Sequence, residues 1–210
     1  MLKNPLFIHG WGFSSKVFGK FKGIKYDLPA HGRNKKPYKG FGEILRELAS
    51  LTWKEHDIVG WSLGGSVALL FSFFYPQKVN RLILIGTTPF FRGAWKEKNI
   101  RAMKMNVKKK GISFFRKLAY GEFDDFFDYE EGFKLLDDYL NLNLYPFLKY
   151  IEKEVFIIHG TDDRIVPPSE AYKLYKSLGN AKLIFLKGGH FPVGNEAYIE
   201  LSLLKSRMHL

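Results

Sequence analysis

The sequence predicts an α/β fold: one domain built on a mostly parallel β-sheet. Short apolar runs alternate with segments of helical periodicity along most of the chain, and this alternation is typical of doubly wound sheets. The apolar runs are continuous in Val, Ile, Leu and Phe, as expected for parallel strands that are buried on both faces. The 210 residues are enough for a single domain with a substantial core.

Six apolar runs are the expected strands, and each leads into a glycine, a proline or a polar residue. They cover residues 5–10, 23–29, 56–62, 81–86, 154–160 and 181–187. The expected core helices lie between them, with helices on both faces of the sheet. These helices span 42–51, 64–75 and 169–178, the last with Ser169 as its expected N-terminal cap and Glu170 in its first turn.

About 65 residues between Gly86 and Glu154 contain no convincing strand. Phe, Tyr and Met are frequent there, and apolar side chains recur at helical spacing. An insertion of this size between two strands is usually a lid over a site. We therefore expect residues 89–151 to form a helical cap, and residues 1–88 and 152–210 to form the core. Three apolar stripes support this: Ile100, Met103 and Val107; Ile112, Phe115 and Leu118; Phe133, Leu136 and Leu140.

Composition excludes several classes of protein. The chain has no cysteine, so it holds no disulfide, no thiol nucleophile and no thiolate metal site. No apolar run approaches the ~20 residues of a membrane helix, and the N-terminus lacks the pattern of a secretory signal. We expect a cytoplasmic protein with no membrane span, and we expect neither a metal nor a cofactor.

The formal net charge of +12 raises two interpretations. It can serve an acidic partner, or it can be a solvated Lys-rich surface. Within the expected cap, residues 92–117 carry ten Lys/Arg and one acid, while residues 122–138 carry eight acids and one Lys. The two halves can neutralise each other, or the basic half can be free to bind a partner.

The pentapeptide Gly60-Trp61-Ser62-Leu63-Gly64 is a G-x-S-x-G motif in the context that a nucleophile elbow requires. An expected strand precedes it and an expected helix follows it, and the glycines stand where side chains would collide. The sequence therefore predicts that Ser62 is a nucleophile.

A serine nucleophile needs a base, and the base needs a carboxylate. Among the six histidines, only His190 follows the last expected strand on a glycine-rich loop. The carboxylate is expected after the strand at 154–160, where Asp162 and Asp163 are adjacent; the spacing in "HGTDDRIVP" favours Asp163. The expected oxyanion donors are the backbone N–H groups of Leu63, directly after the nucleophile, and Trp11, in the early loop "HGWG".

These motifs, together with "DLPAHGR" (27–33) and "GGHFP" (188–192), resemble the α/β-hydrolase superfamily over nearly the whole chain. The pairing of "HGWG" with "GWSLGG" is similar to the family of pimeloyl-[acyl-carrier protein] methyl ester esterases of biotin synthesis (BioH). The resemblance implies an α/β-hydrolase fold with Ser62, Asp163 and His190 as the triad. The first expected strand starts so early that we expect six strands, without the family's usual N-terminal hairpin.

The resemblance also implies a serine carboxylesterase acting on an acyl methyl ester carried by an acidic acyl carrier protein. No nucleic acid is expected as a partner. A general short-chain carboxylesterase and a menaquinone-pathway lyase are the alternatives within this fold, and a non-catalytic basic binding module is the alternative outside it. Expected substrate-binding residues are Trp11, Phe90, Phe91, Met103, Met105, Phe114 and Phe115. Expected partner-binding residues are Arg101, Lys104, Lys108 and Arg116.

Overall fold

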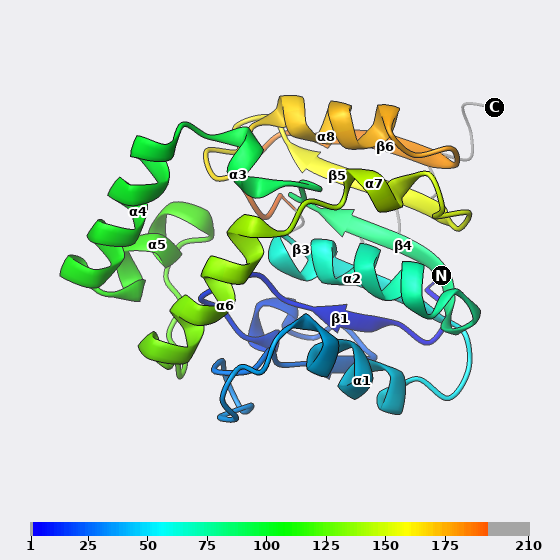
Figure 1. Cartoon of the computed structure of the whole chain (residues 1–210), viewed down its shortest axis with the longest axis horizontal. Helices are drawn as coiled ribbons and strands as arrows, with labels where there is room; N and C mark the ends of the chain where they lie inside the picture. The colour runs from blue at the N-terminus through cyan, green and yellow to red at the C-terminus, as the bar shows by residue number, and fades with distance from the viewer. Residues whose placement is uncertain (1, 193–210) are drawn as a thin grey trace.

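A computed structural model describes residues 2–192 and contains a six-stranded parallel sheet (Figure 1). The strand order is β2-β1-β3-β4-β5-β6, and every pairing is parallel. The predicted fold class is confirmed. The strands are β1 (Leu6–Ile8), β2 (Ile24–Tyr26), β3 (His56–Trp61), β4 (Val79–Ile85), β5 (Glu154–Gly160) and β6 (Ala181–Leu186).

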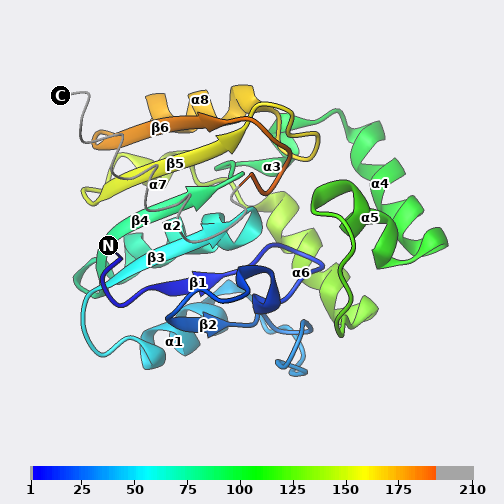
Figure 2. The ribbon, with the colours of Figure 1, turned by 180° about the vertical axis from the view of Figure 1, so that it is seen from behind.

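Within residues 2–192 the core helices lie mainly on one face of the sheet (Figure 1 and Figure 2), so the expected helices on both faces are not seen in this part of the chain. They are α1 (Phe41–Leu51), α2 (Leu63–Phe74) and α8 (Pro168–Lys176). Seen from behind, the opposite face carries the 3₁₀ turn η1 (Ser15–Phe18) in front of β1 and β2 (Figure 2). A second 3₁₀ turn, η2 (Pro76–Lys78), leads into β4. Helix α2 is apolar nearly all round and buried, because it packs between the centre of the sheet and the neighbouring helices.

Parallel pairing brings the carboxyl ends of all six strands to one edge of the sheet. The segment between β4 and β5, residues 89–151, covers this edge and is termed the cap segment below (Figure 1). It contains α3 (Phe91–Ala94), α4 (Glu97–Lys110), α5 (Ile112–Ala119), α6 (Tyr129–Asn141) and the short α7 (Tyr145–Leu148), which precedes β5. In open parallel sheets, ligands bind outside the carboxyl ends of the strands. The arrangement therefore points to a site between this edge and the cap segment.

Two local expectations differ from the structure. Strand β2, at the edge of the sheet, and its neighbour β1 have three residues each, because the parallel pairing ends where the chain leaves the sheet after Tyr26 and after Ile8. Helix α8 begins at Pro168, so Ser169 lies inside its first turn and does not cap it; Glu170 does lie in the first turn. Proline suits a first helical position because it has no N–H that needs a partner there.

Within residues 2–192, none of the helices combines the length and the apolar character needed to cross a membrane.

Candidate active site

Ser62 lies at a sharp turn between β3 and α2. Its φ of 55° is in the left-handed region, which is unfavourable for a residue with a side chain. The flanking glycines allow the turn: a Cβ on Gly60 would lie 2.5 Å from the Gly64 carbonyl oxygen, and one on Gly64 would lie 2.2 Å from that of Ile8. The strained Ser62 at the end of a central strand is the geometry expected of a nucleophile elbow.

The second part of the arrangement is a hydrogen-bonded pair of buried side chains. His190 Nδ1 lies 2.8 Å from Asp163 Oδ2, and both residues are almost fully buried. The other carboxylate oxygen, Oδ1, accepts the N–H groups of Ile165 (2.8 Å) and Val166 (2.9 Å). A carboxylate acceptor beside Nδ1 means that Nδ1 carries the proton, which leaves Nε2 of neutral His190 as a base.

The environment of Asp163 keeps it ionised. Burial by itself raises the pKa of this carboxyl, but His190, the hydrogen bonds from His159 and His190, and the Val166 N–H outweigh burial and hold the pKa well below its usual range. A permanently charged carboxylate next to an imidazole stabilises the imidazolium form when it appears. The neighbouring Asp162 is exposed, and its carboxylate accepts the Thr161 hydroxyl.

His190 is tied to the strand that carries Ser62. The Trp61 indole N–H donates to the His190 carbonyl oxygen over 3.0 Å, and the two rings lie 5.4 Å apart. Among the described residues, Ser62 Oγ and His190 Nε2 share no hydrogen bond. Serine–histidine contacts are often long without substrate and shorten when it binds. The structure thus brings the three predicted triad residues to one edge of the sheet. Of the two contacts that a triad requires, the one between Asp163 and His190 is formed.

The two predicted oxyanion donors lie on neighbouring segments of the same edge. Leu63 begins α2, and Trp11 lies in the loop Gly10–Gly12 after β1, termed the oxyanion loop below. Within residues 2–192, neither backbone N–H is used in a hydrogen bond with another group. A Cβ on Gly10 would lie 3.1 Å from the Ser62 Cβ, so this loop passes directly beside the serine. The two N–H groups are available to a negative oxygen formed next to Ser62.

Three histidines that the motif analysis did not use contribute to the site. His159 Nε2 lies 2.9 Å from the Val166 carbonyl oxygen and 3.1 Å from Asp163 Oδ2. It therefore donates to the same carboxylate as His190. The H-G-T-D-D spacing carries this signal, because it places His159 four residues before Asp163.

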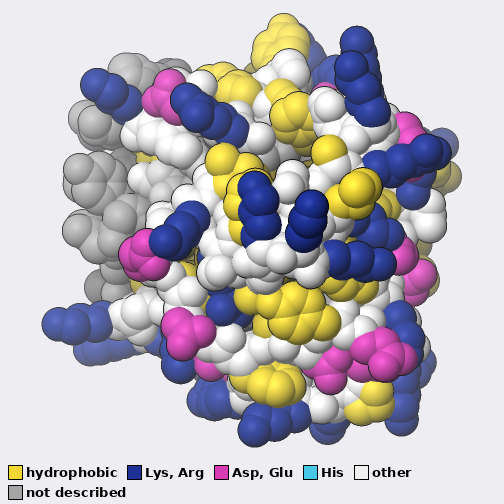
Figure 3. Space-filling model, turned by 90° about the vertical axis from the view of Figure 1, so that its left-hand side faces the viewer, with side chains coloured by type: hydrophobic (Ala, Val, Ile, Leu, Met, Phe, Trp, Pro, Cys, Tyr) yellow, Lys and Arg dark blue, Asp and Glu magenta, His cyan; other side chains and the backbone are white. Residues whose placement is uncertain are grey.

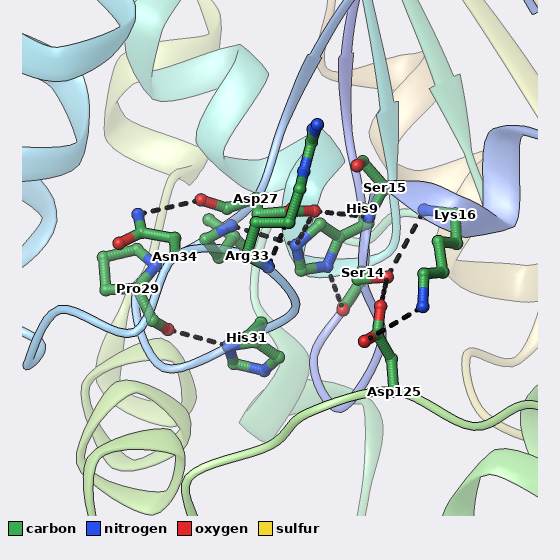
Figure 4. Close-up of polar contacts among 12 residues, drawn as sticks. His9, Ser14, Ser15, Lys16, Asp27, Pro29, His31, Arg33, Asn34 and Asp125 are labelled. Atoms are coloured by element: carbon green, nitrogen blue, oxygen red, sulfur yellow. Dashed lines mark hydrogen bonds and ion pairs between the residues drawn. The ribbon is translucent and has the colours of Figure 1, made fainter.

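The other two, His9 and His31, are fully buried, and their imidazoles lie among the polar side chains shown in Figure 4. His9 Nδ1 lies 2.8 Å from the Gly10 carbonyl oxygen, and His31 Nε2 accepts the Gly12 N–H over 2.9 Å. Burial lowers the pKa of His9 to about 4 and that of His31 to about 3. Both imidazoles are therefore neutral at physiological pH.

An apolar cavity of about 180 Å³ lies beside the loop that follows Asp163. Among the predicted substrate-binding residues, Phe91, Met103 and Phe115 line it. Phe115 also meets the Trp11 ring edge-on at 5.1 Å. Residues that line the cavity but were not predicted are Trp95, Asn99, Ile100, Leu118, Arg164 and Ile165.

The remaining predicted substrate-binding residues lie elsewhere. Phe90 and Phe114 do not line the cavity, and Phe114 instead packs under the Lys110 ammonium at 4.8 Å. Met105 is 69% exposed. Helical periodicity places side chains on a face but does not say what that face meets. Among the described residues no cluster of His, Asp and Glu has the geometry of a metal site.

Comparison with known proteins decides the family. The model of the Alpha/beta hydrolase family matches residues 6–199. The chain belongs to this family. The relationship that the motifs indicated is thereby confirmed.

Individual relatives of this hydrolase share about a quarter of its residues. It is 27% identical to the pimeloyl-[acyl-carrier protein] methyl ester esterase of Wigglesworthia glossinidia brevipalpis, over 96% of this chain and 92% of that one. It is 24% identical to the enzyme of the same name from Nitrosomonas europaea, over 88% and 87%. An esterase from Exiguobacterium antarcticum shares the fold, with a TM-score of 0.77, 16% identity, and coverage of 99% of this chain and 90% of that one.

The predicted partner-binding residues of the hydrolase differ in their surroundings. Arg101 is exposed, with Glu97 3.4 Å away, and Lys108 is exposed with its ammonium 5.4 Å from the Phe133 ring. Lys104 forms an ion pair with Asp137 of α6, so the two charged halves of the cap segment partly neutralise each other. Lys and Arg side chains are nonetheless frequent on this end of the molecule, with apolar side chains exposed between them (Figure 3).

Arg116 is the exception among these four. It is only 2% exposed, and its guanidinium points into the protein. A side chain in this position cannot contact a docked protein, so the prediction that Arg116 binds a partner is wrong. Its helix α5 is amphipathic, and Arg116 occupies the inner face next to Phe115. Sequence charge alone did not reveal this, because most arginines in such a basic segment are solvated.

Proposed function

We propose that this hydrolase is a serine carboxylesterase and that Ser62, His190 and Asp163 are its catalytic triad. The observation that carries the proposal is the Asp163–His190 hydrogen bond at the same sheet edge as the strained Ser62. The names of the curated relatives and of the structural neighbour support ester hydrolysis as the reaction.

In the proposed mechanism, Ser62 Oγ attacks the ester carbonyl carbon while His190 Nε2 takes the hydroxyl proton. The carbonyl oxygen becomes an oxyanion and accepts the N–H groups of Trp11 and Leu63. Collapse of this intermediate breaks the bond to the alcohol, which leaves with the proton from His190. Water then attacks the acyl-enzyme by the same route, and the acid is released with Ser62 restored.

We further propose that the substrate is a short acyl chain esterified with methanol and carried on an acyl carrier protein, as the names of the relatives indicate. The cavity of about 180 Å³ is smaller than the roughly 300 Å³ at which drug-sized sites begin, which fits a short chain. The exposed bases Arg101 and Lys108 are the proposed contacts for the acidic carrier. We expect this reaction in the cytoplasm, as the composition predicts.

The test compares methyl pimeloyl-acyl carrier protein with p-nitrophenyl acetate, using Ser62→Ala as the control. We expect methanol release from the carrier-bound ester and loss of both activities in the variant, with a folded protein by circular dichroism. Hydrolysis of the small ester alone would support a general carboxylesterase. Turnover that survives in Ser62→Ala would contradict the proposed nucleophile.

The carrier contact is tested by charge reversal at Lys108. Lys108→Glu should lower kcat/KM for the carrier-bound ester severalfold at low salt and leave the small ester unchanged, because steering by charge acts on the acidic partner alone. Lys149→Glu is the matched control: Lys149 is an exposed lysine directly after α7, away from the cap helices α4 and α5. Equal effects of the two reversals would contradict a specific docking site.

A further inference from the structure

The direction of the Trp11 N–H depends on the carbonyl on the other side of the same peptide bond. In a planar trans peptide, the C=O of Gly10 and the N–H of Trp11 point in opposite directions. The Gly10 carbonyl oxygen is held at 2.8 Å from His9 Nδ1, and it also accepts the Phe13 N–H at 3.3 Å. Because these contacts fix the direction of the Gly10 carbonyl, they also direct the Trp11 N–H away from His9.

The next peptide groups are held as well. The Gly12 N–H donates to His31 Nε2 over 2.9 Å, and the Gly12 carbonyl oxygen accepts Arg116 Nε over 2.6 Å. Gly12 has a φ of +82°, and a Cβ there would lie 2.9 Å from the Ile112 side chain of α5. Glycine has more backbone freedom than other residues, so these two hydrogen bonds restrict the conformation of the loop beyond Trp11.

Arg116 is unusual because it is charged, buried and contributed by the cap segment. Besides Gly12, its guanidinium donates through Nη2 to the Asp125 carbonyl oxygen over 3.0 Å. Its nearest carboxylate, on Asp124, is 3.7 Å away and fully solvated. Burying a guanidinium costs free energy that weak pairing of this kind does not return. If residue 116 served only to pack α5, an apolar side chain could occupy its place. The hydrogen bond from Arg116 to the Gly12 carbonyl is therefore the contact that explains an arginine here.

Further contacts join the cap segment to the same loop. The Trp11 indole N–H donates to the Gly132 carbonyl oxygen of α6 over 2.6 Å. Ser14 Oγ donates to Asp125 Oδ2 over 2.6 Å, and Lys16 lies 3.2 Å from the other oxygen of that carboxylate (Figure 4). The cap segment thus contacts the oxyanion loop at Trp11 and Gly12, and the chain directly after the loop at Ser14 and Lys16.

We propose that Arg116 is a positioning residue for the oxyanion hole: its Nε–H holds the Gly12 carbonyl and thereby keeps the Trp11 N–H directed toward Ser62. Through this contact the seating of α5 determines whether the oxyanion hole is formed. The inference rests on the proposed function, because the hole has a role only if Ser62 forms an oxyanion.

The test uses Arg116→Met, which keeps much of the side-chain volume and removes every donor, with Arg116→Lys as the conservative variant. Lys117→Met is the matched control, since it removes the same charge from the next, exposed residue of α5. Kinetics are measured with p-nitrophenyl acetate. Binding of benzeneboronic acid is measured in parallel, because its serine adduct is tetrahedral and negatively charged. All assays run well below the melting temperature of each variant.

Loss of one oxyanion donor lowers kcat by about 100- to 1,000-fold, and a misdirected donor should cost part of that. We expect Arg116→Met to lower kcat by about 10- to 100-fold, with KM changed less than about threefold, and to weaken boronic acid binding by a similar factor. Arg116→Lys should recover part of the loss, and Lys117→Met should equal the parent enzyme.

Three results would overturn the inference. The first is an unchanged kcat in folded Arg116→Met. The second is a loss that appears only in KM, and the third is a loss that merely follows the unfolded fraction. If Arg116→Met does not fold, Arg116→Lys decides: parental kcat and boronic acid affinity in that variant contradict a positioning role. Absence of Ser62-dependent turnover in the parent enzyme is a different pattern, and it would remove the proposed function together with the inference.

Discussion

At the residue scale, two adjacent carboxylates have opposite environments. Asp163 is buried, hydrogen-bonded to two backbone N–H groups and in contact with His190. Asp162 is exposed and contacts the Thr161 hydroxyl. The low pKa of Asp163 means that it holds the Nδ1–H tautomer of His190 at every physiological pH.

This difference predicts the effect of two matched substitutions. Asp163→Asn should lower kcat by about 10³- to 10⁴-fold, because an amide no longer fixes the tautomer or stabilises the imidazolium. Asp162→Asn should change kcat less than about twofold, since that side chain does not contact His190. Steady-state kinetics on p-nitrophenyl acetate check both. A large loss in Asp162→Asn with little loss in Asp163→Asn would reverse the assignment.

At the element scale, the cap helices form one wall of the apolar cavity. Helix α4 contributes Ile100 and Met103, and α5 contributes Phe115 and Leu118. The opposite wall is the loop after β5, with Arg164 and Ile165. Because the walls come from the cap and the core, the volume available to an acyl chain depends on how α4 and α5 are seated.

A substitution that fills this volume should shorten the preferred acyl chain. We expect Met103→Trp to lower kcat/KM for p-nitrophenyl hexanoate at least about tenfold and to leave p-nitrophenyl acetate within about twofold, because only the longer chain needs the space. Met105→Trp is the control, since Met105 lies on the same helix but is 69% exposed. If both variants show the same chain-length profile as the parent enzyme, the cavity is not the acyl site.

At the scale of the whole molecule, the buried histidines make the fold sensitive to acid. His9 and His31 are neutral in the folded state, with pKa values of about 4 and about 3, against 6.5 when solvated. Asp27 raises the pKa of both imidazoles and Asp125 raises that of His9, but neither outweighs burial, and the charge of Arg116 lowers the pKa of His31 further. Between pH 6.5 and pH 4 the unfolded chain therefore binds more protons than the folded one, and stability falls as the pH falls.

Urea unfolding at several pH values tests this. The free energy of unfolding should decrease by about 2 kcal/mol for each of the two histidines between pH 7 and pH 5. Asp163, with its lowered pKa, contributes stability that is lost only below its solvated value of 3.8. Equal stability at pH 7 and pH 5, or titration of His9 and His31 near pH 6.5 by NMR, would contradict the prediction.

Much of the fold and of the candidate site could be predicted because the signals are local. Each of these signals reflects the backbone conformation of neighbouring residues. They are the apolar runs at β3, β4 and β5, the glycines around Ser62 and the H-G-T-D-D spacing. Parallel strands bring their ends together, so the chain order of Ser62, Asp163 and His190 also predicts one site.

Other features depend on long-range contacts that no local pattern contains. Arg116 lies 104 residues from Gly12 in sequence, and its charge alone predicts a solvated surface. Phe91, Met103 and Phe115 line the cavity while Phe90, Phe114 and Met105 do not, because the seating of the cap on the sheet selects one face of each helix. The sequence by itself determined the fold, the family and the triad candidates, since these follow from local periodicity and spacing. Only the tertiary structure decided which cap side chains face the site and that a buried arginine holds the oxyanion loop, because burial and partners are set when distant segments pack.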